Sequence, residues 1–117
     1  MFGKKSESGY QETPSGTKVK TLNHGKDMLM VEFLMPKGAT PPAHRHVHEQ
    51  SGYLVSGSIR MFIGDTEMIC HAGDSWSVAS NILHGVEVLE DSVVCEAFTP
   101  VREDYVPFLH EEDVIRT

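Results

Sequence analysis

The sequence lacks most features that mark membrane, nucleic-acid-binding or redox proteins. Its 117 residues include only two cysteines, Cys70 and Cys95, with no C-x-x-C pair, which fits reduced thiols rather than a redox motif. No apolar run is long enough to cross a bilayer. A net charge of −7 disfavours nucleic acid or an anionic membrane as a partner. With no signal-like start, the sequence predicts a cytoplasmic protein.

Helical periodicity is also missing, and turn residues instead recur at intervals of about eight to twelve residues. Strands are expected over residues 17–22, 28–35, 53–55, 58–63, 66–70, 85–89 and 92–98, with Trp76 and Val78 in a further short strand. Gly64-Asp65 is predicted to be a hairpin turn. This pattern is typical of an all-β sandwich or small barrel. The length and a hydrophobic content of 39% predict one domain over residues 1–117.

The two ends of the chain are predicted to be less regular than its middle. Residues 1–16 are polar and rich in glycine, and they are interpreted as a flexible or partner-crossing arm. Residues 111–116 are expected to form a single helical turn. Strand 28–35 is apolar on both faces, which indicates a central strand. Together with the arm, it predicts a homodimer in which an outer sheet face is covered.

The most informative stretch is residues 38–57, GATPPAHRHVHEQSGYLVSG, which holds three of the seven histidines at alternate positions. The prolines and the glycine before them exclude a helix and favour extended backbone. Residues two apart on a strand lie on one face, so His44 and His46 can converge on one cation at about 2.0–2.2 Å each. Gln50 has the same parity, and its amide oxygen could join them. His48 shares this parity too, and a bend after His46 would place it at a pocket rim.

A second stretch, residues 73–84 (GDSWSVASNILH), ends in a fourth well-placed histidine, and the two stretches together resemble the cupin family. The first cupin motif, G-x5-H-x-H-x3,4-E-x6-G, maps onto Gly38, His44, His46, Gln50 and Gly57, with Gln50 where Glu is usual. The second, G-x5-P-x-G-x2-H-x3-N, maps onto Gly73, Ala79, Asn81, His84 and Val88. Asn81 replaces a glycine, and Asn tolerates the left-handed backbone expected there. The resemblance implies a double-stranded β-helix, or jelly-roll barrel.

The resemblance also implies a metal site in the mouth of that barrel. One divalent transition-metal ion (nickel, zinc, manganese or iron) would be bound by His44, His46, Gln50 and His84. Such a set leaves positions open for water or substrate, which distinguishes catalytic from structural metal sites. Because Gln50 carries no charge, the ion would keep more positive character and suit a Lewis-acid role on an oxygen-rich ligand.

The segment from Glu96 to Tyr105, with HRHVHEQ upstream, resembles a narrower group, the small cupins of pectin and alginate breakdown (the KdgF type). Those proteins open 4,5-unsaturated uronates to linear keto forms. The resemblance implies that Glu96 moves a proton, Phe98 packs on the sugar ring and Arg102 holds the carboxylate. The group usually has Asp at the position of Glu96. The structural alternative is that Phe98 belongs to the core and Arg102 pairs with a nearby acid.

Three functions are therefore open at the level of sequence. A metal-dependent lyase or isomerase-like enzyme acting on a small sugar acid is favoured. A cupin dioxygenase that uses iron is the second enzyme class. A non-catalytic sugar- or metal-binding module would keep the histidines without needing Glu96. The fold does not decide among them, because one barrel hosts many chemistries.

Overall fold

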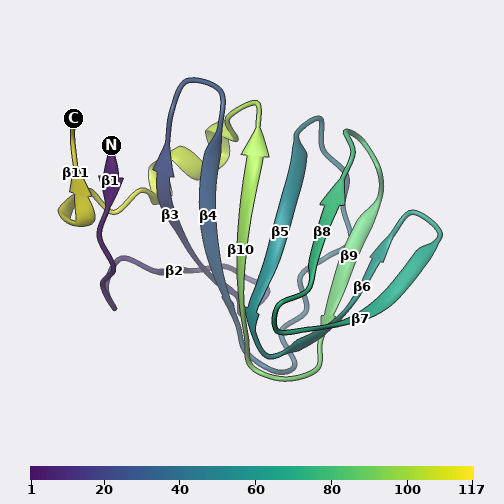
Figure 1. The fold of residues 1–117 in the computed structure, drawn as a ribbon. Coiled ribbons are helices and arrows are strands. Elements are labelled where there is room, and N and C mark those ends of the chain that lie inside the picture. Colours follow the sequence, from purple (N-terminus) through teal and green to yellow (C-terminus); the bar gives the residue numbers. More distant parts are fainter.

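The computed structural model describes all 117 residues, and most of its strands form two facing antiparallel sheets (Figure 1). The larger sheet has the order β2-β3-β4-β10-β5-β8, and the smaller has the order β7-β6-β9. Strands distant in sequence, such as β4 and β10, are therefore neighbours, as in a jelly roll. This confirms the all-β, double-stranded β-helix predicted from the sequence.

The larger sheet consists of β2 (Gln11–Glu12), β3 (Lys18–His24), β4 (Leu29–Met35), β5 (Glu49–Ser56), β8 (Ser75–Val78) and β10 (Ser92–Thr99). The smaller sheet consists of β6 (Ser58–Ile63), β7 (Thr66–His71) and β9 (His84–Val88). β1 (Phe2–Gly3) and β11 (Val114–Ile115) pair with each other, so the two ends of the chain lie side by side (Figure 1). Two 3-10 helices, η1 (Glu103–Phe108) and η2 (Glu111–Asp113), precede β11. No helix is long and apolar enough to span a membrane.

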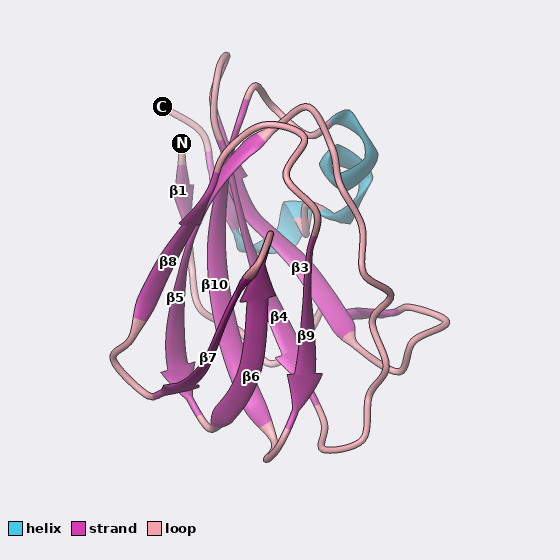
Figure 2. Cartoon of the chain, turned by 90° about the vertical axis from the view of Figure 1, so that its right-hand side faces the viewer, coloured by secondary structure: helices cyan, strands magenta, loops and turns pink.

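Two apolar clusters fill the space that the sheets enclose. The larger lies between the sheets and contains the buried residues Met35, Leu54, Ile59, Met61, Cys70, Val78, Val88 and Val94. The smaller contains Val19, Leu29, Val31 and Phe98, and side chains of η1 pack against it. A hydrogen bond from Thr21 Oγ1 to the Tyr105 carbonyl, 2.6 Å long, ties η1 to β3. η1 therefore lies beside β3 and against the smaller apolar cluster (Figure 2).

The N-terminal segment differs from the loose or partner-crossing arm expected from the sequence. Gln11–Glu12 pairs with β3, and Phe2–Gly3 pairs with β11 of the same chain. At the C-terminus, the expected helical turn over residues 111–116 is limited to η2, and β11 follows it. The N-terminal segment lies on the barrel of its own chain because a side chain on the outer side of β3 binds it.

That side chain belongs to Lys20, which is buried although it carries a charge. Only 3% of Lys20 is exposed. Its Nζ lies 3.1 Å from the Ser6 carbonyl oxygen, 2.9 Å from the Ser8 carbonyl oxygen and 3.2 Å from Asp113 Oδ2. It also lies 4.3 Å from the ring centroid of Tyr10. One ammonium group therefore fastens both ends of the chain to β3.

Several apolar side chains on the outer surface have no cover within the chain. Met28, Met30, Tyr53 and Val55 are between 38% and 56% exposed. Such a surface agrees with the homodimer expected from the sequence. The dimer stays a prediction.

Lys20→Met is expected to lower the free energy of unfolding by roughly 2 kcal/mol, because the Ser6 and Ser8 carbonyls lose a charged donor. The N-terminal segment should also exchange its amide hydrogens faster, which mass spectrometry can measure. Lys18→Met is the matched control, because Lys18 is an exposed lysine on the same strand. Equal protection of residues 2–12 in both variants would contradict the fastening role of Lys20.

Candidate active site

A cavity of about 400 Å³ lies inside the barrel and contains most of the residues singled out from the sequence. Its apolar lining consists of Phe33, Met35, Met61, Val86 and Phe98, with prolines from two loops. Its charged and metal-ligating lining consists of His44, Gln50, His84, Glu96 and Arg102. A pocket of this size, mostly apolar with a few convergent polar groups, is typical of a small-molecule site.

The histidines come from a loop and from the first residue of a strand. His44 and His84 form an isolated antiparallel bridge, with both N···O distances 3.0 Å. The His46 carbonyl accepts a hydrogen bond from the Asn81 amide at 2.7 Å. His44 and His46 lie in the loop before β5, which begins only at Glu49 and is longer than the strand expected over residues 53–55. The left-handed backbone expected at Asn81 is confirmed, with φ at 63°.

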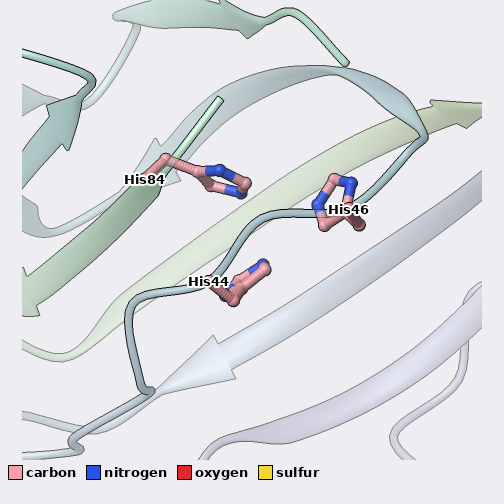
Figure 3. Close-up of side chains that lie close together, drawn as sticks. All are labelled: His44, His46 and His84. Atoms are coloured by element: carbon pink, nitrogen blue, oxygen red, sulfur yellow. The ribbon is translucent and has the colours of Figure 1, made fainter. Parts of the chain in front are cut away.

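His44, His46 and His84 point toward one another (Figure 3). Their candidate ligand atoms all lie within 4.8 Å of one another, a spacing compatible with one metal ion. The ring centroids of His44 and His84 are 4.4 Å apart, and those of His46 and His84 are 5.0 Å apart. His48 is not part of this cluster and does not line the cavity.

A hydrogen bond to a backbone carbonyl holds each of the three imidazoles. His44 Nδ1 lies 3.0 Å from the Pro42 carbonyl oxygen, His46 Nδ1 lies 2.9 Å from that of His48, and His84 Nδ1 lies 2.8 Å from that of Ile82. A carbonyl oxygen only accepts, so each Nδ1 is the protonated donor and each Nε2 carries the lone pair. Histidines that bind metals are oriented in the same way, by a hydrogen bond from the ring nitrogen that does not bind the metal.

Two of these Nε2 atoms, and the side-chain oxygen of Gln50, have no hydrogen-bond partner. Nε2 of His46, Nε2 of His84 and Oε1 of Gln50 are buried and make no hydrogen bond. Buried polar atoms are nearly always paired, so a cluster of unpaired acceptors needs a reason. Burial also lowers the pKa of His46 and of His84, which favours the neutral form that a metal requires. The donor set therefore fits a metal ion.

Gln50 and Glu96 form a buried pair on neighbouring strands of the larger sheet. Gln50 Nε2 donates a hydrogen bond to Glu96 Oε2. This contact turns the NH₂ side of the Gln50 amide toward the acid and leaves Oε1 on the other branch. Burial raises the pKa of Glu96 to about 8, against the opposing attraction of the Arg102 guanidinium.

A glycine on β5 makes room beside this acid. Gly52 lies in register between Glu96 on β10 and Trp76 on β8. A Cβ at Gly52 would lie 2.2 Å from the Trp76 ring, so the indole lies directly over the β5 backbone. Any larger residue at this position would displace the ring that packs next to the site.

Arg102 lines the cavity and is held on three sides. Its Nε and Nη2 lie 3.2 and 2.7 Å from the two carboxylate oxygens of Asp104, a forked ion pair. Its guanidinium carbon lies 4.9 Å from the ring centroid of Phe98 and 4.0 Å from that of Tyr105. The structural alternative is thus partly correct: Arg102 pairs with an acid and Phe98 is 2% exposed, yet both also line the cavity.

Sequence reasoning missed several residues that line or support the cavity. Tyr105 and Thr17 line it, and Asp104 orients Arg102. The position of Asp104, two residues after an arginine of interest, was a usable signal for a local ion pair. Thr17 carried no such signal, because it precedes the cavity residues by a long stretch of chain.

Comparison with known proteins places the chain in a family. The cupin domain family matches residues 30–99, more than half of the chain. The pectin degradation protein KdgF of Dickeya dadantii is 33% identical over 102 residues, which cover 86% of this chain and 93% of that protein. The chain therefore belongs to the cupin family, and within it the chain is similar to KdgF.

Solved structures agree with this assignment. The structure of KdgF from a Halomonas species matches with a TM-score of 0.85 and 29% identity, covering 91% of this chain and 100% of that one. An RmlC-like cupin from Shewanella frigidimarina matches with a TM-score of 0.80 and 28% identity, covering 83% and 87%.

His46→Ala is expected to remove stoichiometric divalent metal and leave a folded barrel, because the apolar clusters do not include this side chain. Metal analysis of the purified variant, with circular dichroism for the fold, measures both outcomes. His71→Ala is the control, since His71 is exposed on β7 and outside the cluster. Retention of a full metal equivalent by His46→Ala would remove the basis for this site.

Proposed function

We propose that the protein is a metal-dependent enzyme that converts 4,5-unsaturated uronates, small sugar acids, into linear keto acids. The observation that carries the proposal is one cavity that combines unpaired ligand atoms on His84 and Gln50 with the buried acid Glu96 and with Arg102, next to the unpaired ligand atom of His46. The pectin degradation role named for the Dickeya dadantii relative supports the substrate class.

The metal site in this proposal consists of His44, His46 and His84, with Gln50 as the fourth ligand through Oε1. Gln50 suits this role because its NH₂ group is already engaged by Glu96. A bound divalent ion would supply Lewis-acid stabilisation of negative charge on a substrate oxygen. The backbone carbonyls behind the three imidazoles keep the ligand atoms turned inward before any ion binds.

The reaction needs a proton moved from oxygen to carbon and no other reactant. The ring opens when the bond between C1 and the ring oxygen breaks and the C1 hydroxyl loses its proton, which leaves an aldehyde and an enol. The enol becomes a ketone when C4 gains a proton and the C4–C5 double bond is lost. Glu96 is the acid on β10 that lines the cavity, and we assign it this proton transfer.

Arg102 is assigned the substrate carboxylate. Its planar guanidinium can grip a carboxylate through two hydrogen bonds, and its side chain is only 13% exposed. Asp104 holds the group in place from the outside, and the Phe98 and Tyr105 rings flank it. Asp104 is therefore a positioning residue in this scheme.

The alternatives make different demands on these residues. A cupin dioxygenase would need iron and oxygen, and a binding module would not need a buried acid that contacts a metal ligand. The contact between Glu96 and Gln50 favours the enzyme over the binding module. Loss of ultraviolet absorbance from an unsaturated uronate, followed with purified protein, tests the proposal directly. A cytoplasmic location and a homodimer are further predictions from the sequence.

Glu96→Gln is expected to lower kcat by about 10²–10⁴-fold, because the amide keeps the shape of the acid but cannot give up or take up the transferred proton. Affinity for a sugar acid, measured by calorimetry, should persist. Glu96→Asp is the informative companion, since it keeps an acid and moves it by a methylene. Full turnover by Glu96→Gln would assign the proton transfer to another group.

Arg102→Ala is expected to raise KM for the uronate more than it lowers kcat, because it removes a carboxylate contact made before and during the reaction. Asp104→Ala should raise KM in the same direction and by less, since the guanidinium remains but is less well oriented. Arg60→Ala is the control, because Arg60 pairs with Glu67 and Glu87 on the outer face. A KM that Arg102→Ala leaves unchanged would refute the assignment.

A further inference from the structure

The N-terminal segment supplies one wall of the cavity, and the proposed chemistry uses none of it. Thr13, Ser15 and Thr17 all line the cavity. They form a turn, here called the hydroxyl turn (residues 13–17), in which the Thr13 amide donates to the Thr17 carbonyl at 2.8 Å. The Thr40 amide donates to the Ser15 carbonyl at 3.2 Å, which ties the turn to the loop that leads to the histidines.

Two of the three hydroxyl protons in the hydroxyl turn are already committed. Thr13 Oγ1 lies 2.9 Å from the Thr17 carbonyl oxygen, which can only accept, so Thr13 donates there. Thr13 Oγ1 also lies 2.9 Å from Ser15 Oγ. Because the Thr13 proton is used, Ser15 must be the donor in this second contact.

Thr17 is the exception. It is only 4% exposed, and its Oγ1 is buried without any hydrogen-bond partner. A buried hydroxyl without a partner is costly, and Thr17 could have been Val in the same β-branched shape without that cost. Thr17 lines the same cavity as Arg102, His44 and His84.

We propose that Thr17 binds a hydroxyl group of the substrate, so that the hydroxyl turn is the subsite that selects a polyhydroxylated acid over a bare ring carboxylate. This inference rests on the proposed function for the substrate class. The free Thr17 O–H donates to a ring hydroxyl, which in turn can donate to the remaining lone pairs of Ser15 Oγ. Arg102 then binds the carboxylate of a sugar acid, and the hydroxyl turn binds its hydroxyl groups.

The test compares two ligands of the same ring and charge on the protein as purified, with its metal content measured. Galacturonate carries ring hydroxyls, and tetrahydropyran-2-carboxylate does not. Thr17→Val should weaken galacturonate binding by about three- to tenfold, the effect of one neutral hydrogen bond, and leave the other ligand unchanged. The melting temperature without ligand should stay equal or rise, because an unpaired buried hydroxyl is removed.

Thr21→Val is the matched control: it is the same substitution on β3, the strand that begins directly after Thr17. The Thr21 hydroxyl is paired with the Tyr105 carbonyl and does not line the cavity. Its loss should lower the melting temperature and, through η1, affect both ligands alike. A merely structural Thr17 would behave like this control.

Equal weakening of both ligands by Thr17→Val, or no change in galacturonate binding, would overturn the proposal. So would a wild-type protein that binds neither ligand. Turnover of an unsaturated uronate is measured separately on the wild type. If turnover is absent but galacturonate binding depends on Thr17, the hydroxyl subsite stands and the proposed reaction fails. If turnover occurs and Thr17→Val does not alter discrimination, only the subsite fails.

Discussion

The hydrogen bonds from three imidazole Nδ1 atoms to backbone carbonyls are the constraint on which the rest of this site depends. Each bond decides a tautomer, and each tautomer leaves Nε2 as the free acceptor. Because the carbonyls belong to residues two positions from each histidine, a short local loop geometry is enough to aim the ring. The bridge between His44 and His84 then brings two of these local units together. This bridge and the hydrogen bond from the Asn81 amide to the His46 carbonyl together assemble the cluster.

The polar groups inside this barrel pair according to whether each can donate or accept a hydrogen bond. Glu96 accepts from the Gln50 amide, and Gln50 is left with an oxygen that has no partner. Asp104 holds Arg102 from outside while two aromatic rings flank the guanidinium. Most of the buried atoms without a partner belong to residues of the cavity or the histidine cluster, namely Thr17, His46, Gln50 and His84. Unmet hydrogen bonds in an apolar barrel lower stability, so their concentration at one place is a functional signal.

The walls of the cavity come from parts of the chain that are far apart in sequence. The hydroxyl turn, the loop before β5, the start of β9 and the end of β10 all meet there. The N-terminal segment reaches this position because Lys20 and the β2–β3 pairing hold it on its own barrel. The contacts that hold the N-terminal segment on β3 therefore help to shape the cavity, although Lys20 itself lies on the other side of β3.

The sequence alone determined most strands of the two larger sheets, the jelly-roll class and the identity of the residues around the histidine cluster, because alternation and motif spacing are local properties. The left-handed position at Asn81 was also readable, since residue type limits the backbone there. Only the tertiary structure decided that His44 and His46 lie in a loop beside His84 and that Lys20 is buried. It alone brought Thr17 to the cavity. These outcomes depend on which distant segment covers which face of a strand, and strand parity carries no information about the partner across that face.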